Sequence, residues 1–114
     1  MMIHHIDHIV LTTANEFSCI DFYTRVLGMQ LESFIGGTPP VERKAFRFGD
    51  QKINLHIKGK EFEPKADIPM PGSLDLCFIA DRPLAEVIAK LNQEQWPIIC
   101  LLYTSDAADD TPCV

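Results

Sequence analysis

The feature that most constrains this chain is a strand pattern that occurs twice. Residues 6–13 (IDHIVLTT) are almost entirely apolar or β-branched, which is typical of a strand buried on both faces, and His8 lies inside the run. Residues 75–79 (DLCFI) repeat the pattern, with Asp75 where His8 stands in the first copy. A repeated pattern predicts a repeated module, so we expect two related βα units in one chain.

The first copy continues as a β-α-β-β-β module that spans residues 1–58. Asn15 is a suitable helix N-cap, and Gly28 is suitable for the residue that ends the helix. Gly49 and Asp50 predict a tight hairpin turn between two alternating strands. The last strand alternates, which places Asn54 and His56 on the face opposite its apolar residues. The expected strands are residues 3–13, 29–35, 42–48 and 51–58.

The second copy is shorter, and we expect it to be an incomplete module. Residues 59–72 contain three prolines and predict a linker. Residues 73–80 then predict a strand, Asp81 a helix cap, and residues 84–91 an amphipathic helix. Another strand is expected to start at Trp96. The predicted fold class is therefore α+β, with a complete βαβββ module followed by a truncated βαβ half-module over residues 73–99.

Charge and composition exclude several classes of protein. The formal net charge is −6 and no basic stripe occurs, which argues against a nucleic-acid partner. No apolar run approaches the ~20 residues that cross a bilayer, and the N-terminus lacks a signal-peptide pattern. The four cysteines form no CxxC pair, so neither a zinc knuckle nor a redox motif is indicated. We therefore expect a cytoplasmic protein without a membrane partner.

The end of the chain carries a different signal. Residues 100–110 (CLLYTSDAADD) resemble a translated sequencing-library adapter of the transposase type. Segments of this kind are excluded from fold reasoning. We expect the native sequence to be replaced after Ile99, so that residues 100–114 are a non-native tail.

The repeated βαβββ pattern resembles the vicinal oxygen chelate superfamily, which contains glyoxalases, bleomycin-resistance proteins and extradiol dioxygenases. The resemblance covers about residues 4–99. Two further segments are similar to the glyoxalase-domain-containing protein five group and its bacterial relatives. The superfamily motifs are IDHIVL (6–11), FY and VLGM within 22–29, and FGDQKINLH (48–56), and the two further segments are EFEPKA (61–66) and PGSLDLC (71–77).

This resemblance implies a sheet curved around a cavity in which a divalent metal chelates the substrate. His8 matches the ligand of the first strand, and His56 and Asp75 are further candidate ligands. The closing glutamate of the family belongs to a strand beyond this chain, so the catalytic residues stay unknown. A histidine and carboxylate set with open positions suits Fe, Mn, Zn or Ni. His8 and His56 also have purely structural interpretations, as a core residue and a strand-surface residue.

A small-molecule substrate would contact polar and aromatic groups around that metal. Asn54 falls where glyoxalase I carries a glutamate, and we interpret it as a pocket-lining group rather than a ligand. Phe46 and Phe48 are the candidate aromatic contacts for the substrate.

Two functions remain open from the sequence. The first is a metal-dependent enzyme that isomerises, epimerises or oxygenates a small oxygen-bearing substrate, a lyase or dioxygenase in family terms. The second is a non-catalytic protein of the bleomycin-resistance type that sequesters an aromatic or cationic small molecule. In either case we expect a homodimer in the intact protein, because open sheet edges attract partners, and a fragment that is inactive alone.

Overall fold

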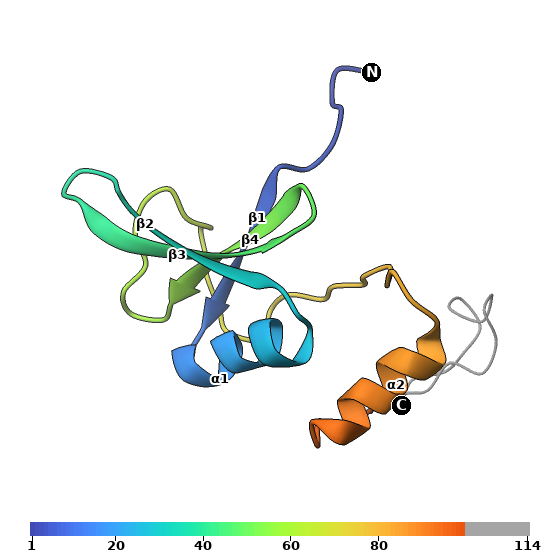
Figure 1. Cartoon of the computed structure of the whole chain (residues 1–114). Coiled ribbons are helices and arrows are strands. Elements are labelled where there is room, and N and C mark those ends of the chain that lie inside the picture. Colours follow the sequence, from blue (N-terminus) through green and yellow to red (C-terminus); the bar gives the residue numbers. More distant parts are fainter. Residues whose placement is uncertain (100–114) are drawn as a thin grey trace. The chain divides into compact units, whose positions relative to one another are not determined.

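A computed structural model of the chain describes residues 1–99 and shows an α+β arrangement (Figure 1). The predicted non-native tail, residues 100–114, lies outside the described residues. Contacts divide the chain into two compact units, with the boundary between Leu76 and Cys77. No helix in the described part combines the length and apolarity needed to cross a membrane. The elements are β1 (His8–Thr13), α1 (Glu16–Asp21), a π-helical turn η1 (Phe22–Val26), β2 (Gln30–Gly36), β3 (Val41–Phe48), β4 (Gln51–Ile57) and α2 (Leu84–Gln93).

The first unit is built on a four-stranded mixed sheet with the order β1-β4-β3-β2. β1 runs parallel to β4, and the other neighbours are antiparallel. The register pairs Val10 with Asn54 and Ala45 with Asn54, so these side chains share one face of the sheet. Phe46 pairs with Ile53 and therefore shares the opposite face.

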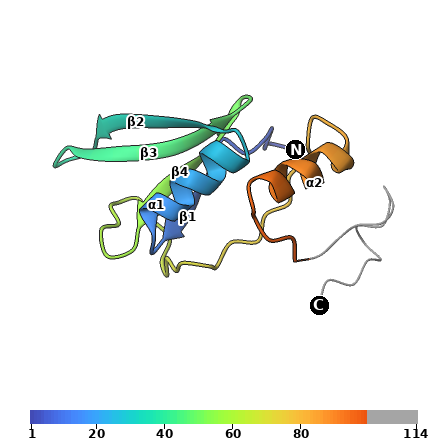
Figure 2. The same cartoon turned by 60° about the horizontal axis from the view of Figure 1, so that its bottom comes forward.

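The core lies between this opposite face and α1 (Figure 2). Phe46 and Ile53 are almost completely buried, at 0% and 1% exposed, and Leu55 lies beside them. Ile20 packs on this cluster, and the Tyr23 ring stacks on Phe46 with 5.0 Å between ring centroids. Fully burying a side chain of this size stabilises a fold by about 1.5–3 kcal/mol. The apolar residues of β3 and β4 thus cover one face of the sheet with the core, and only the opposite face is available for a functional site.

Both predicted helix ends in the first unit are confirmed. Asn15 Oδ1 accepts a hydrogen bond of 3.0 Å from Ser18 N, which satisfies one of the free amides of the first turn. Gly28 adopts φ +80°, a left-handed conformation that glycine takes at no steric cost.

The prediction that the first strand begins at Ile3 is wrong, because the strand begins at His8. The register pairs His8 with Lys52, so residues before His8 would run past the Gly49–Asp50 turn at the start of β4. They have no ladder partner there, and a strand without a partner leaves its backbone groups unpaired.

The second unit differs more from the sequence prediction. Its helix α2 is capped at Pro83 rather than at Asp81, whose carboxylate instead accepts from Arg82 Nε at 2.9 Å. Residues 73–80 and 96–99 are not strands in the described structure. A strand needs a neighbour for its N–H and C=O groups, and the described sheet contains only β1 to β4. The first module's strand order is therefore observed, whereas the predicted half-module retains only its helix.

Candidate functional site

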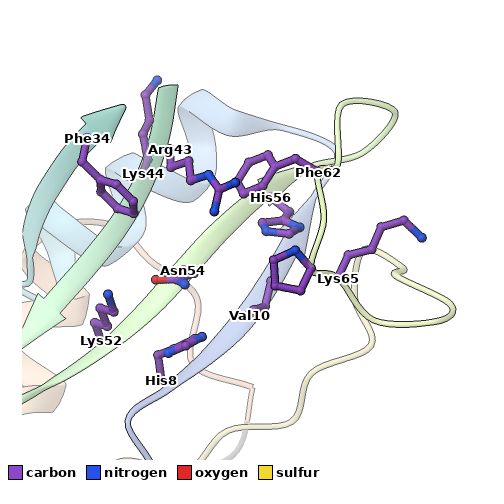
Figure 3. Close-up of a pocket in the computed structure, with 11 residues that line it drawn as sticks. His8, Val10, Phe34, Arg43, Lys44, Lys52, Asn54, His56, Phe62 and Lys65 are labelled. Carbon is purple, nitrogen blue, oxygen red and sulfur yellow. The ribbon is translucent and has the colours of Figure 1, made fainter. Parts of the chain in front are cut away.

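The face of the sheet away from α1 holds a cavity of about 430 Å³ (Figure 3). Alternate residues of β1 and β4 line it, since His8 pairs with Lys52 and Val10 with Asn54. The loop after β4 closes one side of the cavity with Phe62. The remaining lining residues are Phe34, Arg43, Lys44, His56, Pro64 and Lys65.

His8 stands at the start of β1 with an acidic neighbour. Its Nδ1 donates to Asp7 Oδ2 over 2.8 Å, and this hydrogen bond to the imidazole holds the pKa of the Asp7 carboxyl below its usual range. A carboxylate on one ring nitrogen fixes the tautomer and leaves Nε2 to act as a ligand or a base. His8 therefore has the local arrangement of an oriented functional histidine.

His56 lies deeper, in a cluster with Phe62 and Arg43. The His56 residue is only 2% exposed, and its ring lies 4.3 Å from the Phe62 ring, centroid to centroid. The Arg43 guanidinium carbon stands 4.3 Å from the same Phe62 centroid. Burial lowers the pKa of His56, with Arg43 acting in the same direction and Glu61 opposing it. The surroundings of His56 thus favour its neutral imidazole form.

Three buried polar atoms around the cavity have no hydrogen-bond partner among the described residues. They are Arg43 Nε, Asn54 Oδ1 and His56 Nδ1. All three belong to adjacent strands, and all three residues line the cavity. Buried polar groups are almost always paired in folded proteins, so a cluster of unpaired ones indicates groups that a ligand completes.

The charge of the lining is one-sided. Four of its residues are lysine or arginine and none is aspartate or glutamate. Lys44 binds Glu16 and Glu42, and Lys65 approaches Glu63 at 3.8 Å. Arg43 and Lys52 make no ion-pair contact within the described part of the chain, although the Lys52 charge acts on Asp7 and Glu32 from a distance.

Of the sequence-predicted site residues, His8, Asn54 and His56 lie together around the cavity. Asp75 is exposed and is not in the lining. The structure puts Phe46 within the core and packs Phe48 against it, rather than in the cavity. The reason is the alternation of β3, because Phe46 faces the same side as Ile53 while Arg43 and Ala45 face the other.

The fit of these residues to a divalent metal is incomplete. His8 and His56 supply two imidazoles, but the described residues contain no group of three or more His, Cys, Asp or Glu that could hold a metal ion. Protein sites for transition metals ordinarily need three or more protein ligands. The described residues therefore do not form a metal site by themselves.

Sequence reasoning missed Arg43, Lys52 and Phe62. Phe62 was assigned to a linker because its neighbours are charged and prolines follow. A signal for Arg43 existed in the Gly49–Asp50 turn. This hairpin pairs Ala45 with Asn54, and alternation along β3 puts Arg43 on the same face as Ala45. The hairpin register identifies the cavity face, but only if the turn is known to have two residues.

Comparison with known proteins assigns the chain to a family. A sequence model for the Glyoxalase/Bleomycin resistance protein/Dioxygenase superfamily matches residues 5–99. Glyoxalase domain-containing protein RDO1 of Mycosarcoma maydis is 48% identical over 93 residues, which are 82% of this chain and 49% of that protein. Virulence protein STM3117 of Salmonella typhimurium is 47% identical over 93 residues, 82% of this chain and 61% of the relative. The chain thus spans about half to three-fifths of these curated relatives.

Solved structures agree with these sequence matches. The crystal structure of virulence protein STM3117 superposes with a TM-score of 0.79 at 42% identity, over 94% of this chain and 82% of that one. An integron cassette protein from the mobile metagenome of V. cholerae gives a TM-score of 0.74 at 46% identity, over 83% and 70% of the two chains.

Proposed function

The chain belongs to the Glyoxalase/Bleomycin resistance protein/Dioxygenase superfamily, and on that premise we propose that it carries the substrate-facing part of a metal-dependent enzyme. The substrate would be a small oxygen-bearing molecule that is isomerised, epimerised or oxygenated. The observation that carries this proposal is the convergence of His8, Asn54 and His56 on one cavity. Members of the superfamily commonly use divalent metals.

His8 is the residue through which this chain would contribute to such a site. Its Nδ1 is bound to Asp7, so Nε2 is the nitrogen left for a ligand. The described residues leave the ligand set incomplete, and we propose that the rest of it belongs to the longer protein. The metal would be Fe, Mn, Zn or Ni, which imidazole and carboxylate ligands suit. Asp75 remains a candidate ligand only if it moves from its exposed position.

The length of the relatives bears on this proposal. Because the chain spans about half of one relative and 61% of the other, the activity would belong to a longer protein that continues in place of residues 100–114. We propose that this protein belongs to the glyoxalase-domain-containing protein five group and works as a cytoplasmic homodimer. Sequencing the gene beyond the codon for Ile99 tests the first part directly.

A second candidate function is a binder that sequesters a small molecule without chemistry. The rings of Phe34 and Phe62 in the lining favour an aromatic ligand. The net negative charge of the chain favours a cationic ligand. The four lysine and arginine residues of the lining disfavour one. Metal analysis of the purified full-length protein separates the two functions, since stoichiometric divalent metal supports the enzyme.

The variant that tests the enzyme is His8→Ala in the full-length protein. His4 and His5, which are exposed near the N-terminus, are first replaced by glutamine in all samples to remove adventitious ligands. We expect His8→Ala to weaken Zn²⁺ or Mn²⁺ binding by about 100-fold in calorimetry while the thermal melt is retained. Unchanged metal affinity in a folded variant would exclude His8 as a ligand.

A further inference from the structure

We propose that Arg43, His56 and Asn54 form an oxyanion-binding subsite at one end of the cavity, and that the ligand places a carboxylate there. The rest of the ligand would be apolar or aromatic, because Phe34, Phe62 and Val10 also line the cavity. The inference rests on the proposed function in one respect: the ligand is the small molecule on which the site acts. The inference adds that this molecule is negatively charged and that Arg43 recognises the charge.

Arg43 is held in place but has no counter-charge. Its guanidinium lies over the Phe62 ring, and its terminal nitrogen reaches the carbonyl oxygen of Glu63 only at 3.4 Å. The buried Nε has no partner in the described structure. A guanidinium fixed by a ring and presenting free N–H groups is the arrangement that binds carboxylates with two parallel hydrogen bonds.

The carboxylates near Arg43 are already engaged. Glu16 and Glu42 bind Lys44, and Glu63 lies nearest to Lys65. The carboxylate of Glu61 accepts from the backbone amide of Gly59 at 2.9 Å. No carboxylate of the described residues therefore makes an ion-pair contact with Arg43, and an anionic ligand could supply one.

His56 and Asn54 complete the donors on the same side. They lie two residues apart on β4, so both side chains face the cavity with Arg43 (Figure 3). His56 Nδ1 can carry the ring proton, and the Asn54 amide presents either its oxygen or its NH₂ group after a half-turn. His56 Nδ1–H would thus donate to the carboxylate, and after the half-turn the Asn54 NH₂ group would donate to it as well.

The position of Arg43 also argues against a cation at this end. Arg43 and His56 both contact the Phe62 ring, so a divalent ion on His56 would stand close to a guanidinium. Lys52 lies further along the lining, next to His8 on the neighbouring strand. The charges around Arg43 therefore favour an anion, and His8 at the other end, whose ring is bound to the Asp7 carboxylate, is the imidazole left for a metal.

The test compares three probes of similar size and different charge: benzoate, benzamide and benzylammonium. Each is titrated into the 114-residue chain, with binding followed by amide chemical shifts at pH 7.5 and low salt. We expect benzoate to bind at least about tenfold more tightly than benzamide, the difference that a charge-assisted hydrogen-bond pair supplies, and benzylammonium to bind least. Equal binding of benzoate and benzamide by the wild-type chain would overturn the proposal without any variant.

Variants then assign the preference to Arg43. Arg43→Gln should remove the preference for benzoate, and Arg43→Lys should restore part of it because the charge returns without the planar fork. Arg47→Gln is the matched control: Arg47 lies on the same strand and face but is paired with Glu32 and lies outside the lining. A folded Arg43→Gln chain that still prefers benzoate would contradict the subsite.

The outcomes for the two proposals are separable. If His8→Ala abolishes metal binding while benzoate and benzamide bind alike, the enzyme proposal stands and the subsite is wrong. If benzoate is preferred through Arg43 but the full-length protein binds no metal, the subsite stands and the protein is a binder of carboxylates.

Discussion

The two phenylalanines Phe46 and Phe62 differ in what surrounds them rather than in chemistry. Phe46 is 0% exposed and stacks with Tyr23 beneath α1. Phe62 is only partly buried and holds His56 and Arg43 on its ring in the cavity wall. Truncating Phe46 removes packing from the centre of the core, whereas truncating Phe62 removes the platform on which two polar groups rest.

We therefore predict opposite effects for the same substitution at these positions. Phe46→Leu should lower the free energy of unfolding by roughly 1–2 kcal/mol and leave the Kd for benzoate unchanged. Phe62→Leu should change the free energy of unfolding by less than about 1 kcal/mol but weaken benzoate several-fold. Urea unfolding and the probe titration measure both quantities. If Phe46→Leu weakened benzoate in a fully folded chain, Phe46 would be a ligand contact after all.

At the scale of the element, helix α1 depends on its N-cap, the residue just before its first turn. Asn15 caps the amide of Ser18, and Asn15 N is itself bound to Thr13 Oγ1 at 3.1 Å. The cap therefore joins the end of β1 to the start of the helix that covers the core.

Asn15→Ala should lower the free energy of unfolding by about 1 kcal/mol, because a Ser18 amide in the first turn loses its acceptor. Asn15→Asp is the control, since aspartate caps equally well and adds a charge that the helix N-terminus favours. Chemical denaturation of both variants gives the comparison. Equal destabilisation by alanine and aspartate would show that the contribution does not come from the cap.

How far the elements follow from sequence depends on whether their signals are local. The Asn15 cap, Gly28 and the Gly49–Asp50 turn are short-range signals, and the elements of residues 8–57 were predicted within a few residues. Alternation on β4 also assigned Asn54 and His56 to the face away from the core. The strand predicted at 73–80 depends on a neighbour distant in the chain, and Arg43 gains its role from packing against Phe62. The pattern of apolar residues along the sequence predicts neither the neighbour of that strand nor the contact between Arg43 and Phe62.

At the scale of the whole molecule, both edges of the sheet lack a partner strand among residues 1–99. Within that range β1 pairs only with β4, and β2 pairs only with β3. On β2, Leu31 and Ile35 are 42% and 69% exposed and face the same side. An edge strand with exposed apolar residues is a template for pairing with another chain.

We predict that the intact protein is a dimer at micromolar concentration and that Ile35→Lys shifts it toward monomer. A charge on an edge strand opposes strand pairing because the lysine would have to leave water. Met2→Lys serves as the control, since it adds the same charge outside the sheet. Sedimentation velocity measures the species. Only monomer in the unsubstituted protein would exclude the dimer.

The position of β1 also has a consequence for the order in which the protein forms. β2, β3 and β4 are joined by short turns, so their antiparallel ladders close small loops and pair early. β1 must wait for β4, with a helix and two strands between them in the chain. Of these four strands, β1 therefore leaves the ribosome first, and we expect it to be the last to pair. Until then its apolar run is exposed, and His8 joins the cavity only in this final step.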